Sequence, residues 1–83
     1  MHVAIEISLY PLRTDFIPAI QQFIDRLNGI DGLRVETNSM STQVFGDYAL
    51  VMGTLVRELH QAFLVSNKAV FVMKVLGPLA APE

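Results

Sequence analysis

Hydroxyl and amide side chains gather at two places in the sequence that a β-sheet can bring together. Ser8 and Tyr10 end the first predicted strand, and a second group flanks a predicted turn, namely Thr37, Asn38, Ser39, Ser41 and Thr42. Hydroxyl groups donate and accept hydrogen bonds, and an amide offers both functions side by side, so such a cluster suits recognition of a polar small molecule. The alternative is that these side chains only satisfy backbone groups of the turn.

The residues that would support catalysis or metal binding are not arranged for it. His2 and His60 lie far apart in the sequence, and no HxH, HExxH or Cys/His cluster is present. There is no GxSxG segment and no glycine-rich phosphate loop. Arg13, which follows the first predicted strand, lacks the neighbouring glycines of an acylphosphatase-like hydrolase. We therefore expect a protein that is not an enzyme and that uses no metal and no cofactor.

The composition is that of one small domain with an unusually apolar surface. The chain has 83 residues, 52% of them hydrophobic, with 6 basic and 8 acidic side chains and no cysteine. Without a basic stripe we expect no nucleic-acid partner, and without about 20 consecutive apolar residues we expect no membrane span. The absence of cysteine and of a secretory signal in the first residues predicts a cytoplasmic location. We expect a single domain over residues 1–83, with some of its apolar surface facing a partner subunit.

The pattern of apolar residues predicts six elements around this polar cluster. Alternation marks a strand over residues 2–10, and helical spacing marks a helix from a cap at Thr14 or Asp15 to Leu27. The remaining elements are a hairpin of strands 33–39 and 42–45, a helix that Asp47 begins and that ends near Val65, and a strand over residues 68–76. The order βαββαβ predicts the ferredoxin-like α+β fold, a four-stranded antiparallel sheet with two helices on one face.

This fold brings the two polar groups together, because its first and third strands are antiparallel neighbours. Ser8 and Tyr10 are then expected to approach Ser41 and Thr42. The last strand is apolar on both faces, which predicts that it is covered on both sides. Since two helices cover one face only, we expect at least a homodimer, with Ala4 and one row of the last strand at its seam and the ligand site near that seam. The alternative cover for this face is the segment 77–83.

The segments Ser8-Leu9-Tyr10-Pro11-Leu12 and Thr37 to Gly46, in this order, resemble the YkoF-like family of thiamine- and hydroxymethylpyrimidine-binding proteins. The resemblance rests on S-L-Y-P and on the S-T-x-V-x-G segment. It implies a ferredoxin-like domain that binds thiamine or its pyrimidine portion without turnover, in uptake or handling of thiamine or its precursors. The family's namesake has two such domains in tandem, which a homodimer of this chain would restore. The chain departs from the family at Asn38-Ser39, where its relatives favour an acidic residue.

Thiamine combines a thiazolium cation with an aminopyrimidine, so its site needs an aromatic face, a carboxylate and hydrogen-bonding groups. Tyr10 or Phe45 is expected to supply the face and Glu6 the carboxylate, unless Glu6 pairs with Lys74 or Arg34. Asp47 is the second choice for the carboxylate, against the alternative that it caps the second helix. The full candidate site is Glu6, Ser8, Tyr10, Asn38, Met40, Ser41, Thr42, Phe45 and Asp47. The competing hypothesis is a homo-oligomeric structural or regulatory module without a thiamine-related ligand.

Overall fold

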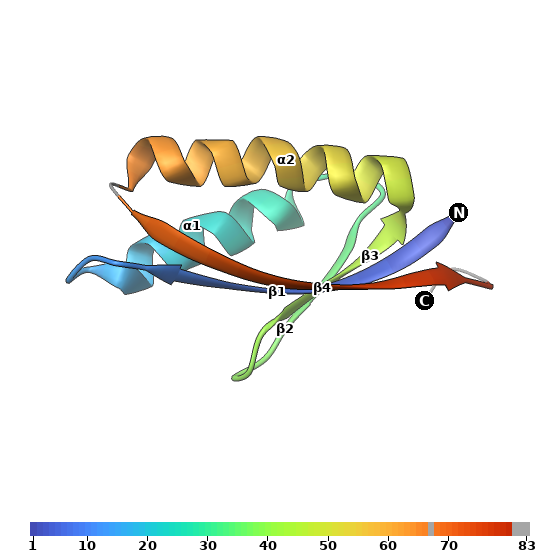
Figure 1. Ribbon diagram of the computed structural model, residues 1–83, viewed down its shortest axis with the longest axis horizontal. Helices are drawn as coiled ribbons and strands as arrows, with labels where there is room; N and C mark the ends of the chain where they lie inside the picture. The colour runs from blue at the N-terminus through green and yellow to red at the C-terminus, as the bar shows by residue number, and fades with distance from the viewer. Residues whose placement is uncertain (67, 81–83) are drawn as a thin grey trace.

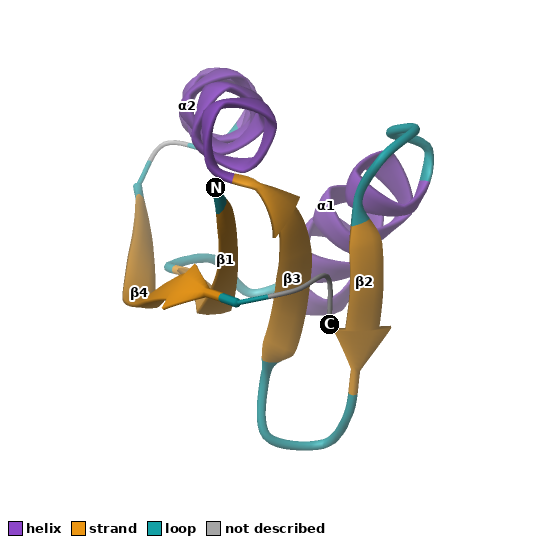
Figure 2. Ribbon diagram, turned by 90° about the vertical axis from the view of Figure 1, so that its right-hand side faces the viewer, coloured by secondary structure: helices purple, strands orange, loops and turns teal. Residues whose placement is uncertain are grey.

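The computed structural model describes residues 1–66 and 68–80, and it has the predicted fold (Figure 1). The elements are β1 (His2–Pro11), α1 (Phe16–Asn28), β2 (Arg34–Thr37), β3 (Thr42–Asp47), α2 (Tyr48–Val65) and β4 (Ala69–Leu79). The four antiparallel strands are ordered β2-β3-β1-β4. Both helices lie on one side of the sheet, and the other side carries no helix in the described part of the chain (Figures 1 and 2).

The core lies between the central strand β1 and the two helices. Strand alternation turns Val3, Ile5, Ile7 and Leu9 towards the helices, where all four are buried. Buried residues of the neighbouring elements complete the core, namely Phe23, Leu27, Val44, Val51 and Leu55. The even-numbered residues of β1 therefore lie on the face without helices, which we call the open face.

The pairing of β1 with β3 stops several residues before β1 ends. Its pairing with β3 runs from His2↔Asp47 to Ile7↔Thr42, whereas its pairing with β4 continues to Pro11↔Ala69. The last residues of β1 therefore have β4 on one side and no β3 partner on the other. The turn between β2 and β3 bends away at this point, below the level of the other strands (Figure 2). The predicted approach of Ser8 and Tyr10 to Ser41 and Thr42 is confirmed by this arrangement.

The two helix starts differ in how they are capped. Asp47 caps α2 as predicted, because its Oδ2 accepts hydrogen bonds from the backbone N–H groups of Ala49 at 3.1 Å and Leu50 at 3.3 Å. The predicted side-chain cap of α1 is wrong, because Asp15 makes no such bond. Its carboxylate instead accepts two hydrogen bonds from Arg13, at 2.7 and 2.9 Å, and this contact lowers the pKa of Asp15.

Strand β4 lies at the edge of the sheet, and the prediction that its two faces are covered is wrong for the single chain, because most of its side chains are exposed. Near its start, Phe71 contacts the rings of Phe23 and Phe63, with ring centroids 5.3 and 5.6 Å apart. From Val72 to Pro78 the residues on both faces of β4 are exposed. The helices therefore cover only the first part of one face. The row beside Ala4 on the open face is Val70, Val72, Lys74 and Leu76, and of the alternative covering segment, residues 81–83 lie outside the described part.

Gly29 and Gly32 lie in the loop between α1 and β2, and replacing each by alanine tests the backbone conformation of this loop. Gly32 has φ +91°, and a Cβ there would lie 2.8 Å from Leu50 Cδ2, so Gly32→Ala should lower the free energy of unfolding by about 1–2 kcal/mol. Gly29 has φ −84° and ordinary space around its Cα, so Gly29→Ala should raise stability by about 0.4–1 kcal/mol. Urea denaturation measures both changes, and equal stability of the two variants would contradict the loop conformation.

Candidate functional site

A slot opens where β1 and β3 diverge, between the end of β1, the β2–β3 turn and α1. It has a volume of about 200 Å³. Its apolar wall consists of core-facing side chains of β1 and α1, namely Ile7, Leu9, Ile20, Phe23 and Ile24. Its polar wall consists of Ser8, Tyr10 and the residues Thr37, Asn38, Ser39, Met40, Ser41 and Thr42. The slot thus combines an apolar wall, which forms its floor, with a polar wall of hydrogen-bonding groups.

The polar wall is held in shape by the side chain of Asn38. Its Oδ1 accepts hydrogen bonds from the backbone N–H groups of Met40 at 2.8 Å and Ser41 at 3.1 Å, which closes an Asx-type turn. Below the turn, the hydroxyls of Thr37 and Thr42 lie 3.1 Å apart and link β2 to β3. Asn38 and Thr42 therefore have structural tasks, as the alternative interpretation of the sequence suggested, while they also line the slot.

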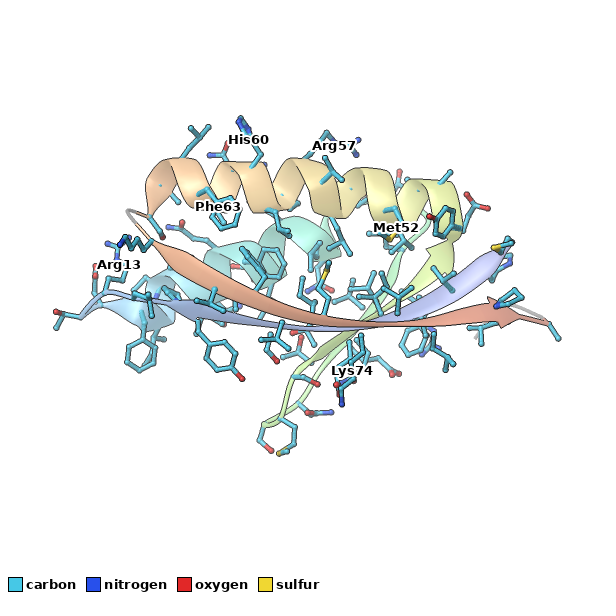
Figure 3. The ribbon with its side chains drawn as sticks, in the orientation of Figure 1. Arg13, Met52, Arg57, His60, Phe63 and Lys74 are labelled. Carbon is cyan, nitrogen blue, oxygen red and sulfur yellow. The ribbon has the colours of Figure 1, made fainter. Side chains whose placement is uncertain are left out.

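Glu6 lies on the open face, next to the slot but outside its lining. Ser41 Oγ donates a hydrogen bond to Glu6 Oε2 at 3.0 Å, and Gln43 Nε2 donates to Ser41 Oγ at 2.7 Å. Lys74 Nζ lies 3.6 Å from Glu6 Oε1 on the other side and projects from the face away from the helices (Figure 3). The expected pairing of Glu6 with Lys74 is present, and the carboxylate reaches the slot only through Ser41.

Phe45 and Asp47 also lie outside the slot lining. The guanidinium carbon of Arg34 stands 3.9 Å from the centroid of the Phe45 ring, so one face of this ring already has a cationic neighbour. Asp47 is at the far end of β3 from Ser41, opposite His2, where it caps α2 and lies 3.6 Å from the N-terminal ammonium group. Of the two aromatic candidates, Tyr10 is the one that the structure brings to the slot.

The slot contains no charged side chain in its lining. A ligand cation or phosphate would therefore enter an apolar and hydroxyl-lined cavity without a counter-ion, which is costly. A neutral ring with hydrogen-bond donors and acceptors on its edge would find donors and acceptors among the hydroxyl and amide groups of the slot. The electrostatics of the slot thus favour an uncharged polar ligand.

A smaller cavity of about 80 Å³ lies between the two helices, on the other side of Phe23 and Leu9, which line both cavities. Its lining includes polar residues of both helices, among them the carboxylate of Glu58 in α2, whose side chain is 8% exposed. Arg26 in α1 binds both carboxylate oxygens, with 3.0 Å between Nη2 and Oε2, and this contact raises the pKa of Arg26. The sequence interpretation missed this pair, because nothing in the spacing of two residues in separate helices indicates that they meet.

The sequence interpretation also missed the contribution of α1 to the slot. The helical spacing of Ile20, Phe23 and Ile24 indicates that they face the sheet. It does not indicate that the β2–β3 turn stands away from them and leaves a cavity. The described residues contain no group of three or more His, Asp or Glu placed to hold a metal ion. None of the described helices is long and apolar enough to cross a membrane.

Comparison with solved structures supports the fold. A protein from Streptococcus pneumoniae has a TM-score of 0.86 at 20% identity, over 96% of this chain and 90% of that chain. A "putative thiamine biosynthesis/salvage protein" from Thermotoga maritima has a TM-score of 0.70 at 18% identity, over 90% and 82%. A domain of unknown function, DUF77, from Bacillus cereus has a TM-score of 0.79 at 16% identity, over 96% and 79%.

No family model and no curated protein matches the chain. At identities of 16–20% the solved structures show a shared fold and leave the ligand open. One of these neighbours carries a thiamine-related name, which fits the YkoF-like resemblance of the sequence. The chain therefore has the ferredoxin-like fold of a group of proteins that includes one named for thiamine biosynthesis or salvage.

Proposed function

We propose that this chain is a non-catalytic binding protein for a neutral, planar nitrogen heterocycle. Its ligand is hydroxymethylpyrimidine, free or as the pyrimidine end of thiamine, and its role is in uptake or handling of thiamine or its precursors. The observation that carries the proposal is the uncharged slot, with hydroxyl and amide groups on one wall and apolar side chains on the other. The thiamine-related name of a structural neighbour points in the same direction.

The chemistry of the slot matches an aminopyrimidine better than it matches a thiazolium ring. An aminopyrimidine presents ring nitrogens that accept and an amino group that donates, and Ser8 and Ser39 hydroxyls serve both. The ring faces are apolar and suit contact with Tyr10 and the floor of the slot. A thiazolium cation lacks a carboxylate there, because the Glu6 carboxylate stands behind Ser41 and beside Lys74. The cationic half of thiamine is therefore expected to remain outside the slot.

The groups at the slot support the proposal of binding without turnover. No histidine, carboxylate, lysine or cysteine belongs to its lining, so the slot lacks the side chains that most often transfer protons in catalysis. Among the slot hydroxyls, Ser41 donates a hydrogen bond to the Glu6 carboxylate, which also lies beside Lys74, and no histidine belongs to the lining. The proposed role is accordingly recognition and not conversion of the ligand.

The proposal includes self-association into at least a homodimer, with apolar side chains of β4 in the interface. Val70, Val72, Met73, Val75 and Leu76 are all exposed in the single chain. So many exposed apolar side chains on the two faces of one strand are typical of an interface. The competing hypothesis is a homo-oligomeric interaction module, which would self-associate through this surface and bind no ligand in the slot.

Titration calorimetry with hydroxymethylpyrimidine, thiamine and thiamine phosphates tests the proposal, and Tyr10→Ala is the informative variant. We expect hydroxymethylpyrimidine to bind and Tyr10→Ala to weaken its binding about 5- to 30-fold, because the variant removes the aromatic contact, worth about 1–2 kcal/mol. Tyr48→Ala is the matched control, since Tyr48 is also an exposed tyrosine but lies outside the slot lining. Its affinity should equal that of the wild type.

Two results would count against the ligand proposal. The first is no heat and no thermal shift with any of these ligands at millimolar concentration. The second is equal weakening by both tyrosine variants, which would place the ligand elsewhere. A chain that self-associates but binds none of the ligands would favour the interaction module.

A further inference from the structure

A chain of side-chain hydrogen bonds runs from the β2–β3 turn to Glu6 in β1. Asn38 Nδ2 donates to Gln43 Oε1 at 3.5 Å, and Gln43 Nε2 donates to Ser41 Oγ at 2.7 Å. Ser41 Oγ then donates to Glu6 Oε2 at 3.0 Å. Asn38 and Ser41 line the slot, whereas Gln43 and Glu6 lie outside its lining and face each other as neighbours in β3 and β1. Two residues outside the slot therefore hold a hydroxyl that belongs to it.

The direction of this hydrogen-bond chain is fixed at both of its ends. At the turn, Asn38 Oδ1 accepts hydrogen bonds from two backbone N–H groups, at 2.8 and 3.1 Å, which leaves Asn38 Nδ2 for Gln43. At the other end, an ionised carboxylate can only accept hydrogen bonds. Lys74 Nζ lies 3.6 Å from Glu6 Oε1 as its cationic partner (Figure 3). Each group between the two ends therefore donates in the direction of Glu6.

The hydroxyl of Ser41 is left with one function. A hydroxyl has one hydrogen and two lone pairs. The hydrogen of Ser41 is used by Glu6, and one lone pair is used by Gln43. One lone pair remains, so Ser41 can accept one further hydrogen bond and has no proton to donate. A ligand group that meets this hydroxyl in the slot must therefore be a donor.

The other two serines of the slot are not constrained in this way. Ser8 and Ser39 make no side-chain hydrogen bond within the described part of the chain, so their hydroxyl hydrogens can rotate towards a donor or an acceptor. A position of fixed polarity is what allows a site to reject a ligand of the same shape, because the wrong group leaves two acceptors facing each other. Ser41 is such a position.

We propose that Glu6 and Gln43 are positioning residues, which fix Ser41 as an acceptor and so select heterocycles that carry an amino group at this edge of the slot. This inference rests on the proposed function and adds a selectivity to it. A ligand with a carbonyl group in place of the amino group would bring an oxygen lone pair to the remaining lone pair of Ser41. Glu6 thus takes part in recognition without touching the ligand.

The shape of the slot cannot make this distinction. An amino group and a carbonyl oxygen are nearly the same size, so the apolar wall accommodates both ligands equally well. The two ligands differ in hydrogen bonding, because the amino group donates where the carbonyl oxygen accepts. A hydroxyl of fixed polarity responds to this difference, and the rotating hydroxyls of Ser8 and Ser39 do not.

Titration calorimetry with hydroxymethylpyrimidine, and with its analogue that carries a carbonyl group in place of the amino group, tests this selectivity. We expect the unmodified chain to bind the amino compound about 10- to 100-fold more tightly. Glu6→Gln should lower this ratio about tenfold or more. The new amide turns its oxygen to the Lys74 ammonium group and its nitrogen to Ser41, so the Ser41 hydrogen is released towards the slot. Most of the change should come from tighter binding of the carbonyl compound, which damage to the turn would not produce.

Glu36→Gln is the matched control. Glu36 is the neighbour of Gln43 in β2, and its carboxylate accepts a hydrogen bond from Arg34 at 2.8 Å. The variant makes the same change on the same sheet but leaves the contact between Glu6 and Ser41 in place, so its ratio should equal that of the unmodified chain. Circular dichroism verifies that both variants fold.

The ratio in the unmodified chain needs no variant and can overturn the inference by itself. Equal affinity for the two compounds, or tighter binding of the carbonyl compound, would show that Ser41 is not a fixed acceptor, while the proposed function would stand. A Glu6→Gln chain that keeps the ratio, including one that loses both ligands equally, would show that Glu6 only shapes the turn. Binding of neither compound to the unmodified chain would overturn the proposed function together with this inference.

Discussion

Arg26→Ala is expected to lower the free energy of unfolding and the Tm by clearly more than Arg13→Ala, which removes the partner of an exposed carboxylate. Arg26→Ala leaves the Glu58 carboxylate in α2 without its bidentate partner in α1. Glu58 is 8% exposed, so its carboxylate then lacks the ion pair that compensates for its burial. The full cost of breaking a buried pair is about 3–5 kcal/mol. We expect less here, because the Arg26 side chain is 53% exposed and water can enter where it leaves.

Two further variants separate the buried pair from an ordinary surface pair. Arg13→Ala removes the partner of Asp15, where both side chains are exposed, and should leave the free energy of unfolding almost unchanged. Replacing both members, as Arg26→Met with Glu58→Met, should recover most of the loss from Arg26→Ala because no unpaired charge remains. Thermal and urea unfolding measure all three variants. A loss from Arg26→Ala no larger than that from Arg13→Ala would show that the contact contributes only as a surface pair.

The fold could be predicted because its main signals are local. The alternation of Val3, Ile5, Ile7 and Leu9 belongs to one strand, and the cap at Asp47 is made with amides two and three residues away. The helix cap at Asp15 failed for a related reason. A carboxylate two residues after an arginine has a second local partner, and the guanidinium of Arg13 holds it instead.

The end of β4 could not be predicted from its apolar pattern. Residues that are apolar on both faces indicate burial on both faces, whether the cover comes from the same chain or from another. In the single chain the helices reach only as far as Phe71. The prediction of cover on both sides therefore failed for one chain, and it becomes a prediction about the assembly.

Some of the predicted site residues line the slot and others do not, and the difference depends on the pattern from which each residue was predicted. Ser8, Tyr10 and Ser41 line the slot because strand parity and the antiparallel order of β1 and β3 fix their neighbourhood. Glu6 has the right parity but lies beside Lys74 on the open face, and Phe45 lies too far along β3. The odd or even position of a residue in a strand predicts which face of the sheet it lies on, but not how close it lies to the slot along the strand. The side chains of α1 line the slot because the β2–β3 turn stands away from this helix. No local sequence pattern predicts that separation.

Phe23 is the residue on which both cavities and the core depend. Its buried ring contacts Phe71 and forms, with Leu9, the wall between the slot and the cavity at Glu58. The ring thus keeps a buried carboxylate apart from a slot whose lining is uncharged. Its position links the stability of the chain to the ligand preference that we propose.

Phe23→Ala is expected to lower the free energy of unfolding by about 3–5 kcal/mol, through lost burial and the cavity that the ring leaves. The same variant joins the slot to the smaller cavity and removes part of its floor, so binding of hydroxymethylpyrimidine should weaken about tenfold or more. Unfolding by urea gives the first quantity, and calorimetry well below the Tm of the variant gives the second. The expected loss is large against the 5–15 kcal/mol that stabilises a typical domain.

Phe63→Ala is the matched control, because Phe63 also contacts Phe71 but is exposed and lines neither the slot nor the cavity at Glu58. It should cost only about 1–2 kcal/mol and leave ligand affinity unchanged, since an exposed ring loses less burial and its removal opens no cavity. If Phe23→Ala destabilised the chain but bound the ligand as the wild type does, the ring would be a core residue only. The ligand would then have to bind away from the slot floor.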